Sequence, residues 1–497
     1  MRRYRPLISR APLTGGALLL GLCGGCGSGD GGSSSSVPDE RPNVLLFTLD
    51  TTRADYLSCY GERTGTTPRI DEVAADGVLY SRALSTAGIT PMSHASILTG
   101  LNNYRHGMRV FYSEDCSHTM KDEVDSIPEI LAAEGYRTSA SISAYVVSEI
   151  FNLDQGIQDF LTGNDYKSMD VSGQQKHPTF FDTKRTSGTQ RRADWTVEDA
   201  VSWLEDVKAE GAPWFMWIHL FDVHDFSLVP SHEYLAEQGI TELPPIGTRP
   251  SPQDQFAWRN RLYVPEMRWM DQRVGEVLDW LRDNGEYDQT VVVITADHGQ
   301  GMEDGQRLHG WSKHRLLYDW CVHVPLIVKL PESELSGTTV DTQVRTIDIA
   351  PTILDALGIS GPDMDGRSAL GLARGEDDGL ARIAYAEALN LYDTHSPGRR
   401  ALPKGHYDNL YSVSDGDWKL VLREEDQSAH ELYNVSLDPD EQANLYRADH
   451  PEVTRLRAFL DEHEPWNVEL PFGDEAASSD ALNALGYTGG DEDEEDE

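Results

Sequence analysis

The run Asn43-Val-Leu-Leu-Phe-Thr-Leu-Asp50 decides the fold class of this chain. Continuous apolar runs of this length are typical of strands that are buried on both faces, as in parallel sheets. In open α/β sheets, ligands gather at the carboxyl ends of the strands. Asp50 directly ends the run, so we expect a catalytic carboxylate at this position.

Further strand and helix patterns alternate along the chain beyond this run. We expect strands at 138–144, 214–220, 290–295 and 324–329. We expect helices at 127–134, 195–210, 265–283 and 347–357. This alternation predicts an α/β fold with a large, mostly parallel sheet flanked by helices.

The composition changes after about residue 370. Short strand patterns follow at 382–387, 409–414, 418–423 and 430–435, and a helix pattern follows at 451–462. Asp415-Gly416 is the clearest hairpin signal among them. We therefore predict a catalytic domain at 42–370, an α+β subdomain on an antiparallel sheet at 371–474, and a disordered acidic tail at 475–497.

The first residues have the layout of a targeting segment. Four arginines precede a short apolar stretch at 17–22, and Cys23 and Cys26 follow it. This layout resembles a bacterial lipoprotein signal, in which a cysteine after the apolar run is acylated. We predict a signal peptide at 1–26 with Cys26 favoured over Cys23, a Gly/Ser linker at 27–41, and export to the cell envelope as a lipid-anchored protein. Ordinary secretion and an uncleaved anchor are the alternatives.

Charge and cysteine content exclude several classes of protein. The 497-residue chain has a formal net charge of −41, which repels nucleic acids, so we expect no nucleic-acid partner. Cys59, Cys116 and Cys321 remain after the predicted signal, and their irregular spacing forms neither a disulfide framework nor a zinc motif. The sequence does not indicate an oligomeric state.

Three short stretches carry the chemistry. They are Asp50 at the end of the first run, Thr90 before Pro91-Met92-Ser93-His94, and Asp297-His298-Gly299 after a second apolar run. Two carboxylates, an imidazole and a hydroxyl can hold a divalent metal against that hydroxyl, which the metal would activate as a nucleophile. We predict Asp50, Thr90, Asp297 and His298 as the ligands of one ion rather than two, with Ca, Mn, Mg and Zn all suited.

Several ordered motifs resemble the sulfatase family of the alkaline phosphatase superfamily. They include the run at 43–55, Thr67-Pro-Arg-Ile-Asp71, Ser93-His-Ala-Ser-Ile-Leu-Thr-Gly100, Arg105-His-Gly107 and Thr295-Ala-Asp-His-Gly299. The resemblance continues at 324–328, 348–355, 415–420 and 431–441, and it spans about residues 42–488. It implies a sulfatase-like α/β fold and a hydrolase that acts on an anionic ester.

The chain departs from the family at the nucleophile. The family's Cys-x-Pro-x-Arg signature, whose first residue becomes formylglycine, is replaced here by Thr90, Met92 and His94. Oxidation of a threonine would give a ketone, so we do not expect a formylglycine mechanism. Superfamily members with threonine at this position use its hydroxyl directly, mostly on phosphoesters, and the resemblance therefore implies attack by Thr90 on phosphorus.

The resemblance also implies roles for neighbouring residues. His224 matches a histidine that contacts the substrate anion, and Lys313 or His314 matches a group near the leaving oxygen. Arg53 and Asp55 match residues behind the metal, while Thr51 stands where a second acidic ligand is usual. A second ion would need a further set of ligands, for which the candidates are His219, Asp222, His224, Asp225, His309 and His314.

The sequence thus predicts a metal-dependent hydrolase that cleaves a phosphate mono- or diester through Thr90. Three alternatives stay open. The protein could hydrolyse sulfuric esters, it could transfer a phosphoryl group to a lipid or glycan hydroxyl, or it could be an inactive surface binding protein that has kept the fold.

Overall fold

The computed structural model describes residues 41–61, 66–109, 119–163, 180–185, 189–248, 250–310, 313–376, 379–389, 409–424 and 426–467. The predicted signal peptide with Cys23 and Cys26, nearly all of the linker, Cys116 and the acidic tail lie outside these residues. The part of the chain from Asp39 onward forms one compact unit. The predicted boundary at residue 370 lies within this unit and stays a prediction.

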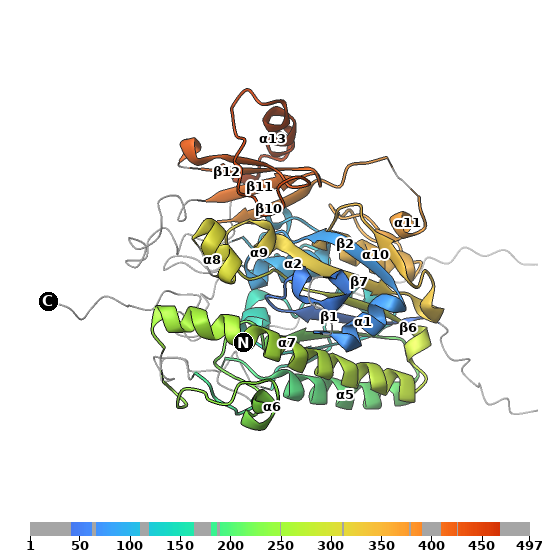
Figure 1. The fold of residues 1–497 in the computed structure, drawn as a ribbon. Coiled ribbons are helices and arrows are strands. Elements are labelled where there is room, and N and C mark those ends of the chain that lie inside the picture. Colours follow the sequence, from blue (N-terminus) through green and yellow to red (C-terminus); the bar gives the residue numbers. More distant parts are fainter. Residues whose placement is uncertain are drawn as a thin grey trace, which may run out of the picture. The chain divides into compact units, whose positions relative to one another are not determined.

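A large mixed sheet forms the centre of this unit (Figure 1). In the described residues it has nine strands in the order β4-β3-β5-β1-β6-β7-β2-β8, with β9 also paired to β2. Their bounds are β1 Asn43–Leu49, β2 Val78–Leu84, β3 Arg137–Ile142, β4 Asp159–Leu161, β5 Trp214–Leu220, β6 Thr290–Thr295, β7 His323–Lys329, β8 Thr338–Val340 and β9 Val344–Arg345. Strand β7 runs antiparallel to both of its neighbours, and the other pairs are parallel. The predicted mostly parallel sheet is confirmed.

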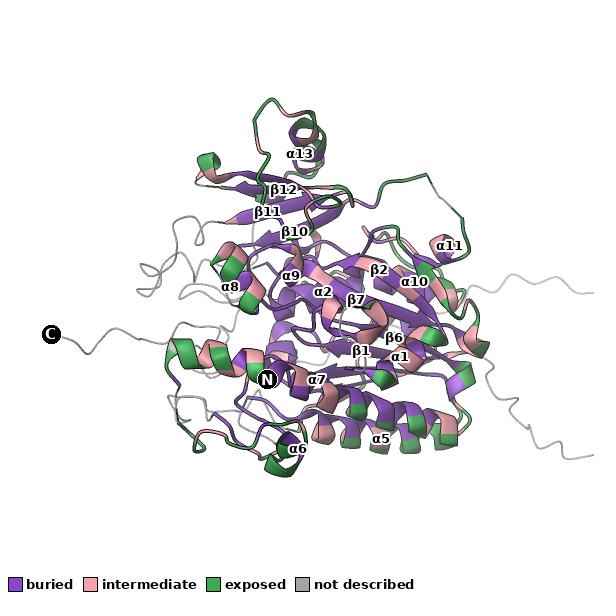
Figure 2. Ribbon diagram, in the orientation of Figure 1, coloured by how far each residue is buried: buried purple, intermediate pink, exposed green. Residues whose placement is uncertain are grey.

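Helices cover both faces of the sheet. Successive side chains of β1 point to opposite faces, and each face buries its apolar side chains against a different set of helices. Val44 and Leu46 belong to the core on one face, with α2 (Thr90–Thr99), α4 (Ile127–Ala133) and α10 (Ile349–Ala356). Leu45, Phe47 and Leu49 belong to the core on the other face, with α1 (Pro68–Ala75), α5 (Ala193–Glu210) and α7 (Pro252–Asp283). Figure 2 shows the strands buried and the outer sides of α5 and α7 exposed.

A second sheet follows near the C-terminus. Its four described strands pair antiparallel in chain order, namely β10 Ala384–Ala388, β11 Leu410–Ser414, β12 Trp418–Arg423 and β13 Glu431–Asn434. Helix α13 (Pro451–His463) packs on this sheet. The Glu387 backbone N–H donates to the Thr86 carbonyl at 3.0 Å, which ties β10 to the segment just before α2. The predicted antiparallel subdomain is confirmed.

Two predicted helices have different bounds in the structure. Helix α7 begins at Pro252, not at Pro265, because the Ser251 side chain caps it by accepting from the Asp254 N–H, and the helix then continues through Pro265. The segment predicted as one helix at 347–357 is a 3-10 turn (η8, Thr346–Asp348) followed by α10.

The remaining α-helices of the described residues are short. They are α3 Asn103–His106, α6 His232–Glu237, α8 Glu303–His309, α9 Asp319–Val322 and α11 Leu370–Ala373. Within the described ranges, no helix combines the length and the apolar character that crossing a membrane requires.

Candidate active site

The predicted metal and nucleophile residues meet at the carboxyl ends of β1 and β6. Asp50 directly follows β1, Asp297 and His298 follow β6, and Thr90 is the first residue of α2. Side-chain ligand atoms of Asp50, Asp297 and His298 lie within 4.8 Å of one another. Thr90 Oγ1 lies 3.2 Å from His298 Nε2, and all four residues are buried. The structure therefore brings together the four residues that the sequence predicts as metal ligands and nucleophile.

Each carboxylate is held through one oxygen. Asp297 Oδ1 accepts from the backbone N–H groups of Thr51 at 3.0 Å and His298 at 2.8 Å. Asp50 Oδ2 accepts from His219 Nε2 at 3.2 Å. The second oxygens, Asp50 Oδ1 and Asp297 Oδ2, are buried and make no hydrogen bond of normal geometry with the described residues. Two oxygens are thus left to bind something else.

The hydrogen bond at the other ring nitrogen determines the His298 tautomer. Its Nδ1 lies 3.0 Å from the Gly299 carbonyl, which can only accept, so Nδ1 carries the proton. The Nε2 lone pair is therefore directed toward Thr90 and toward Asp297 Oδ2, which is 3.3 Å away. A lone pair at this position can serve as a metal ligand.

The charge balance of the site favours a cation. Burial raises the pKa of Asp50 well above its usual range, and the nearby Asp297 carboxylate adds to this, while the Thr90 hydroxyl opposes it. A divalent ion would relieve the desolvation and the repulsion, because buried charges need a partner. The donor set of Asp50, Asp297, His298 and Thr90 therefore fits a divalent metal.

Thr51 offers a fifth donor atom to this set. Its hydroxyl is buried and has no hydrogen-bond partner in the described part of the chain. Its backbone has φ of +50°, which is unusual for a β-branched residue. The Tyr263 hydroxyl donates to the Thr51 carbonyl at 2.7 Å and accepts from the Arg53 N–H at 3.1 Å, which holds this turn in place.

Two further predicted residues reach the site. His314 and His298 have ring centroids 4.7 Å apart, and His314 and His224 have ring centroids 5.3 Å apart. His314 Nδ1 donates to the Gly88 carbonyl at 2.9 Å. Burial lowers the pKa of both His224 and His314, so both imidazoles are neutral. Lys313 precedes His314 with an exposed side chain. The roles of these three residues stay predictions.

The candidates for a second ion have other partners. His219 bonds Asp50, and Asp222 accepts from the Ala193 N–H at the start of α5, at 3.0 and 3.3 Å. Asp225 Oδ2 lies 3.9 Å from His224 Nδ1, and His309 stacks on Tyr318 with ring centroids 3.5 Å apart. Across the described residues, the metal-ligating side chains that converge are Asp50, Asp297 and His298.

Arg53 and Asp55 follow the turn that carries Thr51, and their supporting role behind the metal stays a prediction. Arg53 is buried and pairs with Asp55 at 2.7 Å and Asp304 at 2.6 Å. The sequence did not identify Tyr263 or Asp304 as supports of this turn. Both lie far from Arg53 along the chain and carry no local motif.

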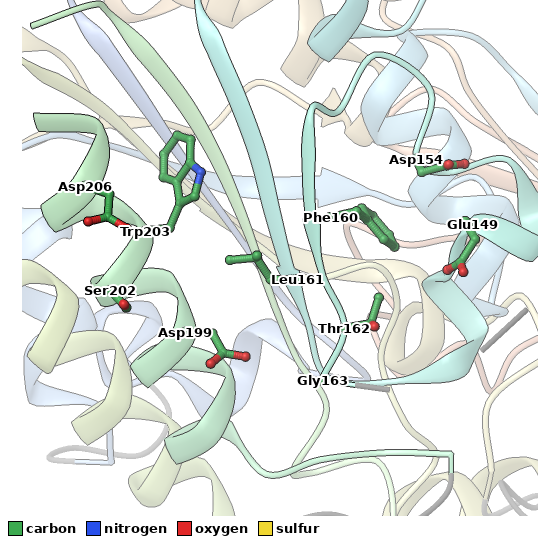
Figure 3. Close-up of a pocket in the computed structure, with 10 residues that line it drawn as sticks. All are labelled: Glu149, Asp154, Phe160, Leu161, Thr162, Gly163, Asp199, Ser202, Trp203 and Asp206. Atoms are coloured by element: carbon green, nitrogen blue, oxygen red, sulfur yellow. The ribbon is translucent and has the colours of Figure 1, made fainter. Parts of the chain in front are cut away.

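A pocket of about 780 Å³ lies elsewhere, beside the edge strand β4. Figure 3 shows its lining, which combines residues of α5 with residues around β4, namely Glu149, Asp154, Phe160, Leu161, Thr162, Gly163, Asp199, Ser202, Trp203 and Asp206. No predicted site residue lines it. The predicted active-site residues therefore lie in the buried cluster of Asp50, Thr90, Asp297 and His298 and not at this pocket.

Comparison with known families agrees with the fold and with the motifs. The sequence profile of the family described as "Sulfatase" matches residues 42–359. The chain belongs to the sulfatase family. A second profile, "N-sulphoglucosamine sulphohydrolase, C-terminal", matches residues 307–463 of this sulfatase-family chain. The protein is accordingly an ester hydrolase of this family.

Individual relatives are distant but match over most of their length. An N-acetylglucosamine-6-O-sulfatase of Bacteroides thetaiotaomicron is 22% identical and covers 82% of this chain and 83% of its own. A solved protein in complex with its substrate D-glucosamine-2-N,6-O-disulfate has a TM-score of 0.64 at 19% identity, covering 88% of this chain and 100% of its own. A phosphonate monoester hydrolase of Agrobacterium radiobacter has a TM-score of 0.62 at 21% identity, covering 85% and 95%. The structural neighbours thus include both a protein with a sulfated substrate and a phosphonate monoester hydrolase.

Proposed function

We propose that this sulfatase-family protein is a metal-dependent hydrolase of phosphate mono- or diesters that uses Thr90 as its nucleophile. One observation carries the proposal: Thr90 Oγ1 lies 3.2 Å from His298 Nε2 at the first residue of α2, beside two buried carboxylates. A hydroxyl in this environment can attack directly, and a threonine cannot become the formylglycine aldehyde.

The residues present would divide the reaction between them. Asp50, Asp297, His298 and Thr90 would hold one divalent ion, with the Thr51 hydroxyl as a further donor. Such an ion lowers the pKa of a hydroxyl bound to it and neutralises charge on the phosphoryl oxygens. The positive N-terminal end of α2 would stabilise the same anionic oxygens.

Displacement proceeds in two steps. The Thr90 hydroxyl loses its proton to solvent and its oxygen forms a bond to phosphorus, while the bond from phosphorus to the ester oxygen breaks and Lys313 gives a proton to that departing oxygen. Water then attacks phosphorus as the bond to the Thr90 oxygen breaks, which releases phosphate from a monoester or a phosphate monoester from a diester. The Thr90 oxygen and Lys313 regain their protons from solvent. His314 is neutral with its proton on Nδ1, so its Nε2 can take the proton of the attacking water. His224 would contact the substrate anion.

The deciding assay compares aryl phosphate monoesters and diesters with an aryl sulfate. The signal-less protein is stripped of metal with a chelator and reloaded separately with Ca, Mn, Mg or Zn. We expect phosphoester turnover that requires metal and falls about a thousandfold or more in Thr90→Ala, while Thr90→Ser keeps measurable turnover because its hydroxyl is retained.

A sulfuric ester is the second candidate substrate, because relatives such as the Bacteroides protein are named as sulfatases. Turnover of the aryl sulfate alone would overturn the phosphoester assignment. A phosphorylated acceptor alcohol among the products would identify a transferase. A protein that binds no divalent ion and hydrolyses no ester would be a binding protein.

A further inference from the structure

His94 lies one helical turn after Thr90 on α2 and is fully buried. Its Nδ1 lies 2.8 Å from the Thr90 carbonyl oxygen. A carbonyl can only accept, so Nδ1 carries the ring proton and donates it to the residue that holds the nucleophile. The imidazole thus holds the backbone of Thr90 directly.

The other ring nitrogen reaches a different element. His94 Nε2 lies 3.0 Å from Thr48 Oγ1, and Thr48 lies on β1 two residues before Asp50. The same hydroxyl accepts from the indole Nε1 of Trp217 at 2.9 Å. An indole can only donate, so the Thr48 proton is directed to His94 Nε2. The donor and the acceptor are therefore determined for each of the three hydrogen bonds that connect Thr90, His94, Thr48 and Trp217.

The ring is also fixed by packing. Its centroid lies 5.5 Å from that of Trp217 and 5.1 Å from that of His219, which itself bonds Asp50. Nδ1 lies 3.7 Å from Asp297 Oδ2. Burial lowers the pKa of His94, in agreement with a neutral ring that gives one hydrogen bond and receives one.

A neighbouring side chain bonds the same carbonyl without this bridge. Ser93 Oγ donates to the Thr90 carbonyl at 3.0 Å and to the Ile89 carbonyl at 3.1 Å. Both acceptors are local to the start of α2, and neither belongs to β1. The comparison separates a bond that only closes a helical turn from one that links α2 to the strand of Asp50.

We propose that His94 is a positioning residue: by bridging Thr90 on α2 to Thr48 on β1, it sets the distance between the hydroxyl nucleophile and the metal carboxylates. The inference rests on the proposed role of Thr90. Nucleophiles misplaced by about 1 Å lose on the order of a hundredfold in rate, which is the scale that such a bridge controls.

The test is a double-mutant cycle on the metal-loaded, full-length mature protein. His94→Ala removes the bridge, Thr48→Val removes its β1 end with little change of shape, and the double variant removes both. We expect kcat to fall about 10- to 100-fold in each single variant with KM changed less than about threefold. The double variant is expected to fall no further than His94→Ala, because both substitutions break one bridge. Ser93→Ala, the matched control, is expected to stay within about threefold of the wild-type kcat.

Crystal structures of the same variants decide the inference independently of turnover. The bridge predicts that the Thr90 Oγ1 to His298 Nε2 distance departs from 3.2 Å in His94→Ala and in Thr48→Val but not in Ser93→Ala. Unchanged Thr90 geometry, additive losses in the cycle, or an equal loss in Ser93→Ala would each overturn it. A wild-type protein inactive on every ester refutes the proposed function, while the distance comparison still tests the bridge. Thr48→Val keeps the test available if His94→Ala does not fold.

Discussion

Thr51 is the most strained residue of the site. A β-branched side chain at φ of +50° costs roughly 1–2 kcal/mol. Tyr263 holds its carbonyl, and Asp297 holds its N–H. The result is a buried hydroxyl without a hydrogen-bond partner in the described part of the chain, next to Asp50. Strain that is maintained by two hydrogen bonds indicates a function for the hydroxyl, and a metal bound at the site would supply one.

We predict that the Thr51 hydroxyl contributes to metal affinity. Thr51→Val keeps the shape and removes the oxygen, so we expect the Kd for Mn²⁺ to rise about tenfold or more, the scale on which supporting groups change metal affinity. Isothermal titration calorimetry of the metal-stripped protein measures this. Thr51→Ser keeps the oxygen and is expected to bind within about threefold of wild type. If Thr51→Val binds Mn²⁺ with the wild-type affinity, the Thr51 hydroxyl does not contribute to metal binding.

At this scale, the residues that sequence could identify are those next to a local pattern. Asp50 and Asp297 follow apolar runs, and Thr90 precedes a Pro at a helix start, so their positions in the sequence already carry information. His94 was visible as a departure from the family signature, but its bonds to Thr48 and Thr90 were not. Such a bond depends on the packing of α2 against β1, which no spacing along the chain encodes.

Among the secondary-structure elements, the turn after β6 depends on Gly299. A Cβ at Gly299 would lie 2.3 Å from the Trp320 carbonyl oxygen, and the Gly299 N–H donates to the Cys321 carbonyl at 2.6 Å. Only a residue without a side chain lets the end of β6 approach α9 this closely. The turn that carries Asp297 and His298 is therefore stabilised by backbone contact.

Gly299→Ala should consequently destabilise the fold more than a glycine substitution in open space. We expect a loss of about 3 kcal/mol in the free energy of unfolding, measured by urea denaturation, because the contact is with rigid backbone. Gly211 is the matched control, since it has φ of +70° and no atom within 4 Å of an added Cβ. Gly211→Ala should cost about 1 kcal/mol from backbone strain alone. Equal losses in the free energy of unfolding for the two variants would show that the α9 backbone can move away from the added Cβ.

The secondary-structure elements were predictable to the extent that burial leaves a continuous pattern. β1, β5 and β6 are buried throughout and appear in the sequence as apolar runs. β2 was not predicted, because Ser81 and Arg82 interrupt its apolar run; in the structure the pairing with β7 shifts register at these two residues and continues on either side of them. Pro265 misled the prediction of α7, because prolines usually mark the first turn of a helix and this one lies inside it.

For the whole molecule, the buried histidines contribute to the response to acid. Burial lowers the pKa of His94, His106, His219, His224, His314 and His323. The unfolded chain regains ordinary imidazoles, so it binds more protons than the folded chain once the pH falls below about 6.5. The contribution of these histidines to stability therefore decreases as the pH falls through this range. Asp222 and Asp271, whose pKa burial raises to about 7, act in the opposite direction.

His106 isolates one contribution to this acid response. Its Nδ1 accepts from the Met108 N–H at 3.1 Å and its Nε2 bonds Ser96 Oγ at 2.9 Å, and burial lowers its pKa to about 3. Between about pH 7.5 and about pH 5, this group alone should remove about 2 kcal/mol of stability, at 1.36 kcal/mol per pH unit below its unfolded pKa. His106→Gln cannot take up that proton.

The free energy of unfolding of wild type minus that of His106→Gln should therefore shrink by about 2 kcal/mol over this range. Urea denaturation in the presence of a chelator measures it without a contribution from bound metal, and the carboxyl groups common to both proteins cancel in the difference. A constant difference for His106→Gln would mean that this imidazole is protonated in the folded protein, and that the hydrogen bond from the Met108 N–H to its Nδ1 is broken to allow it.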